Sequence, residues 1–220
     1  IRGWQEVRKL NLGQWGALAF IGWGGSATAT VLFSQGFLLS GQLFAHGQYG
    51  AGASAINALV LLQQTQPLFA VLAAVIFLRE RVTWLYLPIF VISAAGAYFI
   101  AFAQPGQNLL TPFSLIGGAQ IQFALIALGA AFFWGASTAM GRLLSDKLAF
   151  VTLTAGRFAM ALPFLLVWAL LTVPNLPRTF AQGLSQPNAV LYLVLLALVP
   201  GLLGLLLYYR GLRHTRASYA

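Results

Sequence analysis

The sequence predicts an all-α membrane protein with six transmembrane helices. Hydrophobic residues make up 60% of the 220 residues and charged residues only 7%, whereas a soluble domain carries about 25% charged residues. Six apolar stretches are continuous and long enough for the ~20 helical residues that cross a bilayer core. They show no period-two alternation, which argues against barrel strands. The expected helices span 13–38, 53–78, 84–103, 119–142, 148–172 and 188–209.

The distribution of Lys and Arg gives a third, independent indication of membrane spans. Basic residues fall almost wholly in every second segment that flanks an apolar stretch. Arg178 alone lies on the opposite side, and Arg157 lies inside a stretch. Because basic loops stay cytoplasmic, we expect both visible ends of the chain in the cytoplasm. The residues on the cytoplasmic side are Arg2, Arg8, Lys9, Arg79, Arg81, Arg142, Lys147, Arg210, Arg213 and Arg216.

The first three helices have recognisable ends. The helix over 13–38 follows the basic segment and carries Trp15 at its cytoplasmic end. The helix over 53–78 stops at Arg79, and the helix over 84–103 opens on Trp84. Aromatic rings of this kind favour the headgroup level of a bilayer.

The last three helices end in the same way. The helix over 119–142 follows a glycine pair, and the helix over 148–172 has Trp168 near its outer end. The helix over 188–209 follows Pro187 and closes on Tyr208 and Tyr209, which we assign to the cytoplasmic aromatic belt. Close contacts between helices are expected at three groups of small residues. These groups centre on Gly22, Gly135 and Gly201.

The connection over 104–118 is the longest and is rich in Pro and Gly, so it marks the best internal boundary. A weak repeat links the first and last helices. Leu32-Phe33-Ser34-Gln35-Gly36-Phe37 is similar to Leu207-Tyr208-Tyr209-Arg210-Gly211-Leu212. These two helices cross the membrane in opposite directions, so a true repeat would be inverted, as in many transporters.

Three passages resemble the EamA-type branch of the drug/metabolite transporter superfamily. Gln66-Pro67-Leu68 opens an apolar helix that closes on Glu80. Trp134-Gly135 resembles the opening of each family half, and Gly156-Arg157-Phe158 resembles the Arg-aromatic step of the next helix. The order of the passages makes the resemblance more specific than any one of them.

The resemblance implies a ten-helix transporter built from two inverted five-helix halves. Residues 1–118 would form the C-terminal part of the first repeat, with three helices. Residues 119–220 would form the N-terminal part of the second, also with three. We therefore expect a fragment of a longer protein of the bacterial inner membrane. A natural six-helix form is the alternative.

Arg157 is the sharpest candidate for a substrate contact. An arginine at mid-helix costs about 2.5–3.5 kcal/mol on insertion scales, so it should face a wet cavity or a polar partner. It could anchor a carboxylate or phosphate of a substrate. The alternative is a structural arginine that binds backbone carbonyl groups.

A second candidate is the polar strip in the middle of the second helix. Asn57 and Gln64, seven residues apart, share one helical face, while Gln63 and Gln66 define a neighbouring one. Pro67 removes a backbone donor and is expected to kink the helix. The strip could line a central cavity or hydrogen-bond a neighbouring helix.

Three further residues have two interpretations each. Trp23 and Trp134 could form aromatic walls of a substrate site or simply pack in the core. Glu80 lies between two arginines at the cytoplasmic interface. It could form a local ion pair or a gate contact.

These features favour a secondary transporter or facilitator that exports small polar metabolites such as amino acids by alternating access. No Asp or Glu lies within a predicted span, which disfavours cationic substrates. A non-transporting membrane subunit is the main alternative.

An enzyme ranks last, because no nucleophile has a histidine near it within a span, and no cofactor or metal is expected. The expected partners are lipid and a small metabolite, not nucleic acid; self-association into a homo-oligomer stays open.

Overall fold

A computed structural model describes residues 2–45, 53–81, 83–102 and 118–213 of the chain. The secondary structure of these residues is helical, without a strand. Five helical stretches are long and apolar enough to cross a membrane. The predicted all-α membrane fold is therefore confirmed. The five stretches are Leu12–Gln42, Ile56–Leu78, Ile121–Ser145, Phe150–Thr172 and Ala189–Leu212.

The third expected span begins later than the sequence predicted. It is α6 (Tyr86–Phe102) in the described part of the chain. Trp84, which was expected to open it, instead lies in a turn and is exposed. The backbone N–H of Tyr86 bonds to the carbonyl of Thr83 at 2.9 Å, so this turn takes up the residues before the helix.

The chain divides into two compact units. The first contains residues 1–27 and 140–216. Its core gathers around Leu18, Ile21, Leu144, Leu153 and Tyr209, each almost fully buried. Its helices are α1 (Arg2–Arg8), α2 (Leu12–Ala19), most of η1 (Phe20–Thr28), the end of α7 (Gly118–Ser145), α8 (Phe150–Thr172), α9 (Leu176–Leu184), α10 (Ala189–Leu196), η3 (Ala197–Gly204) and α11 (Leu205–Leu212).

The second unit contains residues 28–139. Its core is formed by Leu59 and Leu62 with Phe123 and Ala127, and Phe33 packs against it. Its helices are α3 (Ala29–Ala45), α4 (Ala53–Gln63), α5 (Gln66–Leu78), α6 and the larger part of α7.

The second span is interrupted in its middle, where Pro67 predicted a kink. α4 ends at Gln63 and α5 begins at Gln66, with a turn between them. Pro67 has no N–H to donate to the carbonyl of Gln63, so the α-helical ladder is broken there. The backbone N–H of Thr65 bonds instead to the carbonyl of Leu62 at 3.1 Å, and the Thr65 hydroxyl donates to the same carbonyl at 2.7 Å.

Two other spans contain π-helical segments, which are rare and frequent at functional sites. η1 follows α2 in the first span, and η3 follows α10 in the last. Both follow an α-helix of eight residues. Pro200 lies inside η3, whereas η1 contains no proline and is rich in glycine.

Two short helices lie outside the predicted spans. α1 precedes the first span, and α9 lies between the predicted spans over 148–172 and 188–209. Glu6 on α1 accepts a hydrogen bond at 3.0 Å from the backbone N–H of Ala149, the N-cap residue of α8. Alanine has no side-chain acceptor to cap a helix. Glu6 instead satisfies the N–H of the N-cap residue, as the N3 side chain does in a capping box.

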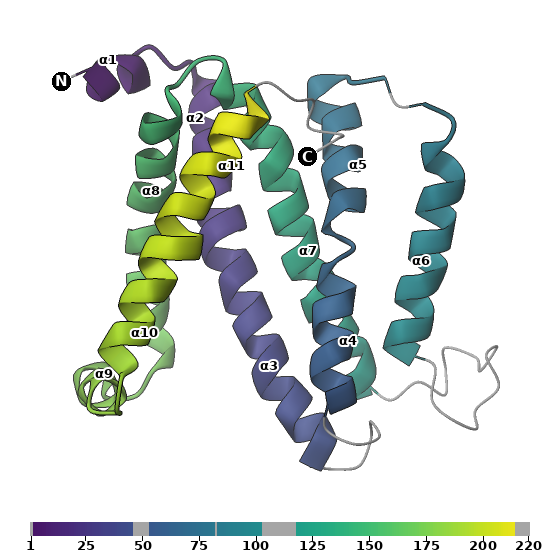
Figure 1. Ribbon diagram of the computed structural model, residues 1–220, viewed down its shortest axis with the longest axis vertical. Helices are drawn as coiled ribbons and strands as arrows, with labels where there is room; N and C mark the ends of the chain where they lie inside the picture. Colours follow the sequence, from purple (N-terminus) through teal and green to yellow (C-terminus); the bar gives the residue numbers. More distant parts are fainter. Residues whose placement is uncertain (1, 46–52, 82, 103–117, 214–220) are drawn as a thin grey trace. The chain divides into compact units, whose positions relative to one another are not determined.

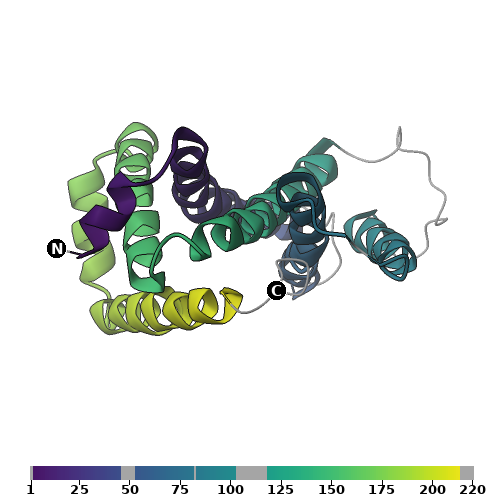
Figure 2. The same ribbon diagram turned by 90° about the horizontal axis from the view of Figure 1, so that it is seen from above.

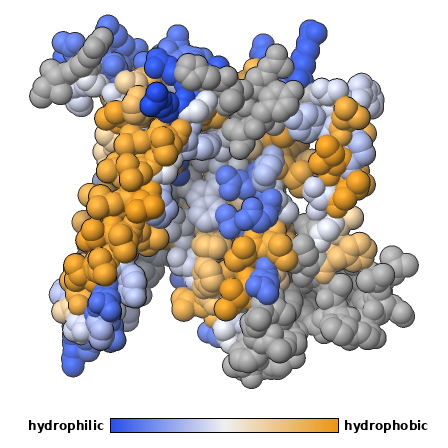
Figure 3. Space-filling model, viewed as in Figure 1, coloured by the Kyte–Doolittle hydropathy of each residue, from blue (hydrophilic) through white to orange (hydrophobic). Residues whose placement is uncertain are grey.

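The basic residues of the first unit mark one of its ends. Gly141 near the end of α7 lies against Tyr209 and Leu212 of α11, and Arg142 and Arg210 belong to these neighbouring helix ends. α9, with Arg178, lies at the opposite ends of α8 and α10 (Figure 1). Figure 3 shows the apolar band over α10 and α11 between these two ends.

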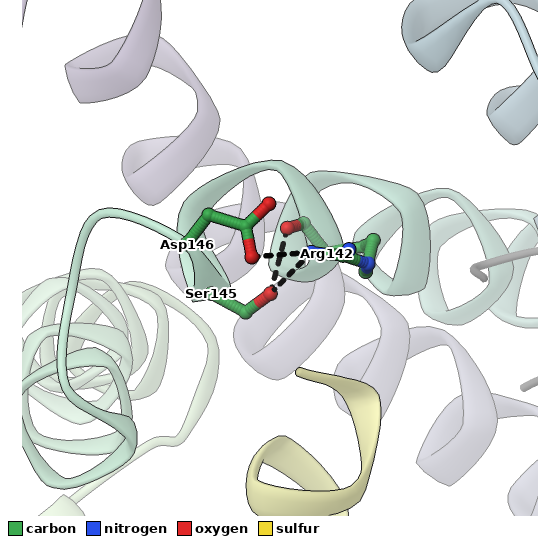
Figure 4. A network of polar contacts seen from close by, with 3 residues as sticks. All are labelled: Arg142, Ser145 and Asp146. Carbon is green, nitrogen blue, oxygen red and sulfur yellow. Dashed lines mark hydrogen bonds and ion pairs between the residues drawn. The ribbon is translucent and has the colours of Figure 1, made fainter. Parts of the chain in front are cut away.

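A polar network closes α7 at the basic end (Figure 4). Arg142 Nη1 lies 2.8 Å from Asp146 Oδ1 and donates to Ser145 Oγ at 3.0 Å. Ser145 Oγ in turn donates to the carbonyl of Arg142 at 2.8 Å. The network holds the short turn that leads into α8.

Candidate substrate-binding site

Arg157 lies in α8 and is buried, with 8% of its surface exposed. Its Nε donates to Ser26 Oγ. Nη1 donates to the phenol oxygen of Tyr209 at 3.1 Å, and Nη2 donates to the carbonyl of Gly25 at 3.2 Å. The guanidinium thus joins α8 to the π-helical segment η1 and to α11. All four residues belong to the first unit.

No carboxylate neutralises this buried cation within the spans of the described chain. The three acidic residues of the sequence are Glu6, Glu80 and Asp146. Glu6 caps α8, Asp146 pairs with Arg142, and Glu80 follows the end of α5. The partners of Arg157 are two hydroxyl groups and one carbonyl group, which offer dipoles but no countercharge. These bonds use three of the five guanidinium N–H groups.

Small residues let α8 approach the first span this closely. A Cβ at Gly22 would collide with the Cβ of Met160 and would lie 3.1 Å from the carbonyl oxygen of Arg157. Gly156 lies against the side chain of Leu18 in the same way. Close packing at the Gly22 group was predicted, and it brings the hydroxyl of Ser26 and the carbonyl of Gly25 to the guanidinium.

Tyr209 corrects one sequence assignment. It was expected in the aromatic belt at the cytoplasmic end of its helix, but it is only 1% exposed. A buried tyrosine needs a partner for its hydroxyl, and Arg157 provides one. The neighbouring Tyr208 is half-buried. The sequence offered no signal to separate two adjacent tyrosines.

The amide residues of the strip lie on both sides of the α4–α5 interruption. Gln63 ends α4 and Gln66 begins α5, and both are half-buried; Asn57 and Gln64 are exposed. None of these four side chains hydrogen-bonds another residue in the described parts of the chain. Their amides stay available to water or to a ligand.

Gly135 on α7 lies against the start of α5, beside this interruption, within the second unit. A Cβ at Gly135 would lie 2.5 Å from the carbonyl oxygen of Gln66 and 2.8 Å from the backbone nitrogen of Ala70. The close approach predicted for the Gly135 group is therefore present. Trp134 is half-buried, and its ring contacts Phe33 edge-on at a centroid distance of 5.3 Å.

The remaining sequence candidates lie elsewhere. Trp23 in the first unit is 49% exposed. Glu80 is half-buried, and its backbone N–H bonds to the carbonyl of Ala74 at 3.2 Å, closing α5. Arg79, before it, adopts a left-handed conformation with φ of 54°. Gly201 approaches only the Leu196 carbonyl of its own span among the described residues, so it shows no contact with another helix.

The predicted site residues thus divide between the units. Arg157 and Trp23 belong to the first, while Asn57, the three glutamines, Pro67, Glu80 and Trp134 belong to the second. An apolar hollow of about 370 Å³ in the second unit, between α5 and the start of α6, is lined by residues such as Val71, Trp84 and Phe90. None of the predicted site residues lines it.

Among the described residues, no three His, Asp or Glu side chains could hold one metal ion. His46 and His214 lie outside the described residues.

Comparison with known families supports the resemblance seen in the sequence. The family model of EamA-like transporters matches residues 122–220, which include Trp134, Arg157 and Tyr209. No match was found among curated proteins or solved structures. The apolar helices and this match describe a multi-pass membrane protein. The predicted EamA-type resemblance is confirmed by this match over residues 122–220.

Proposed function

We propose that the chain is part of a secondary transporter or facilitator that exports small polar metabolites, such as amino acids, by alternating access. The proposed membrane is the bacterial inner membrane, with the basic helix ends in the cytoplasm. The grouping of basic residues at one end of the first unit supports this orientation.

The observation that carries the proposal is the buried, uncompensated charge of Arg157. Keeping a cation in a helical span without a carboxylate is costly, and its dipolar partners offset this cost only in part. An anionic group of a substrate would supply the missing countercharge. The two guanidinium N–H groups that the described bonds leave over are available to such a group. This chemistry favours anionic or zwitterionic substrates over cations.

Two features of the helices support alternating access. The interruption between α4 and α5 and the π segments are places where a span can bend, because their backbone ladders are already irregular. The alignment of the weak sequence repeat places the two π segments at overlapping positions. Aligning Gly36 with Gly211 sets Phe20 against Leu195 and Thr28 against Leu203, so that η1 and η3 overlap. This correspondence favours residues 1–118 and 119–220 as parts of two inverted halves.

A non-transporting membrane subunit is the second candidate. The three hydrogen bonds that Arg157 makes within its own unit favour it, because they fit a residue that holds helices together. The two candidates differ in what Arg157→Lys should do. A helix-holding role needs the forked guanidinium, whereas a countercharge role keeps part of its effect with an ammonium group.

Transport by the intact protein in proteoliposomes tests the proposal. Candidate amino acids would be loaded inside, and efflux followed for the wild type, Arg157→Ala, Arg157→Lys and Gln64→Ala. We expect efflux to fall at least tenfold in Arg157→Ala and less in Arg157→Lys and Gln64→Ala. Gly16→Ala, in α2 with open space around it, is the control for losses during purification and reconstitution. Unchanged efflux in both alanine variants of the site would contradict the assignment.

A further inference from the structure

The short helix α9 has one apolar and one polar face. At 100° per residue, Leu176, Phe180 and Leu184 fall within an 80° arc, and Arg178 and Gln182 point the opposite way. None of the nine residues of α9 is buried, and Phe180 is 62% exposed. Leu176 and Leu184 are half-buried, so in the described structure protein covers the apolar face only in part.

α9 lies across the two spans that it connects. Figure 1 shows α9 end-on, while α8 and α10 run along the plane of that view, and Figure 2 shows α9 lengthwise. Its axis therefore runs across both spans, which belong with it to the first unit. If α8 and α10 cross a bilayer, α9 runs parallel to the membrane surface.

Two asparagines make the sharp turns that set this direction. Asn175 and Asn188 have φ angles of 50° and 61°, in the left-handed region. Asparagine tolerates this region better than most residues. Asn175 immediately precedes α9, where Pro177 occupies the first turn, and Asn188 immediately precedes α10. The chain thus leaves α8 and enters α10 by tight turns on either side of α9.

We propose that α9 is an interfacial helix, whose Leu176, Phe180 and Leu184 side chains enter the acyl region of the adjacent lipid leaflet. We assign lipid as the partner of the apolar face because the connections from α9 to α8 and α10 are short. Three residues separate α9 from the end of α8, and four separate it from α10. At no more than ~3.6 Å per residue, these tethers hold α9 at the level where the two spans leave the bilayer.

The polar face of α9 accounts for Arg178, the one basic residue that the sequence places on the side opposite the other basic segments. Arg178 lies opposite Leu176 on α9 and is exposed, so its guanidinium can reach lipid phosphate while the apolar face lies below it. Amphipathic helices of this composition bind in the headgroup region. The assignment of α9 to the outer leaflet rests on the orientation that we proposed for the protein. The insertion of its apolar face into lipid is independent of that orientation, because the same face would enter either leaflet.

Spin labels on the two faces test the proposal. The sequence contains no cysteine, so single labels at Phe180→Cys and Gln182→Cys can be introduced into the intact protein, with any further cysteine replaced. In liposomes of mixed neutral and anionic phospholipids, we expect the label at 180 to collide with oxygen and to be shielded from a water-soluble nickel complex. The label at 182 should show the reverse. Leu171→Cys, at an exposed position of α8, is the control for a lipid-facing site.

Two results would overturn the proposal. Equal access of both labels to the nickel complex would mean that α9 stands clear of the membrane. Shielding of the label at 180 from both reagents would mean that protein, such as a second copy of the chain, covers this face. The result is independent of substrate transport. A variant that fails to transport but keeps the two-faced pattern would contradict the proposed function and leave α9 in the lipid.

Discussion

Arg157 donates a hydrogen bond to the phenol oxygen of Tyr209 over 3.1 Å, and both side chains are buried. This bond ties α8 to α11 in the first unit, while the same guanidinium holds η1 through Ser26 and Gly25. One side chain therefore fixes three segments that are distant in sequence. Any movement of these segments past one another must break or exchange its bonds.

Tyr209→Phe removes the phenol oxygen and keeps the ring in the core. We expect the free energy of unfolding in detergent to fall by about 0.6–1.7 kcal/mol, the range of such bonds between membrane helices. In a double-mutant cycle with Arg157→Lys, the two losses should be less than additive, because both variants break the same bond. Strict additivity would show that the bond contributes nothing to stability.

Gly22→Ala tests the close approach of α8 to η1. The added methyl would collide with Met160, and such overpacking costs about 1–3 kcal/mol. Met160→Ala in the same chain should not recover that loss, because the collision is with the Cβ atom of residue 160, which alanine keeps. Gly16→Ala is the matched control, because nothing lies within 4 Å of it. We expect the control to gain stability by about 0.5–1 kcal/mol, as alanine does relative to glycine within helices. Equal losses at both positions, measured by thermal unfolding, would contradict the packing.

Pro67→Ala tests the interruption of the second span. The new N–H can bond to the carbonyl of Gln63, so we expect α4 and α5 to become more continuous, with slower hydrogen exchange at residues 64–68. The melting temperature should stay the same or rise, while efflux should fall several-fold. Pro88→Ala is the control, because Pro88 lies in the first turn of α6, where no helical acceptor is lost. Efflux at the wild-type level in Pro67→Ala would contradict a role for the bend in transport.

Glu6→Ala tests the capping of α8 from α1. Losing the acceptor for the Ala149 N–H should cost about 0.5–2 kcal/mol, as for other N-caps. Ala149→Ser adds an acceptor for the N–H groups of Val151 and Thr152 instead, so its gain should be the same with and without Glu6. Unchanged stability in Glu6→Ala would show that the bond to Ala149 contributes nothing to α8. Both comparisons can be made by thermal unfolding in one detergent.

The sequence predicted the spans well because hydropathy and charge act locally. Five spans occur where expected, and Pro67 interrupts the second as its missing N–H requires. α9 was missed because it is too short and too polar to read as a span. Its signal was the spacing of Leu176, Phe180 and Leu184. α6 begins later than predicted, since hydropathy does not distinguish the turn at Trp84 from a helix start.

The site was less predictable, because its partners come from different helices. Burial of Arg157 followed from its position within an apolar stretch, but nothing local pointed to Tyr209 or to the carbonyl of Gly25. Those contacts depend on how closely glycines let the helices approach. Similarly, the facing of Gly135 and Gln66 is a property of two packed helices rather than of either sequence segment.

The most direct test of the central claim measures which ligand group Arg157 recognises. The intact protein and Arg157→Ala would be titrated with an amino acid that the wild type transports and with its carboxamide, in which the negative charge is removed. We predict that the wild type binds the carboxylate form at least tenfold more tightly and that Arg157→Ala loses this preference. A preference of equal size in both proteins would contradict the account, because the buried guanidinium would then not be the countercharge of the substrate.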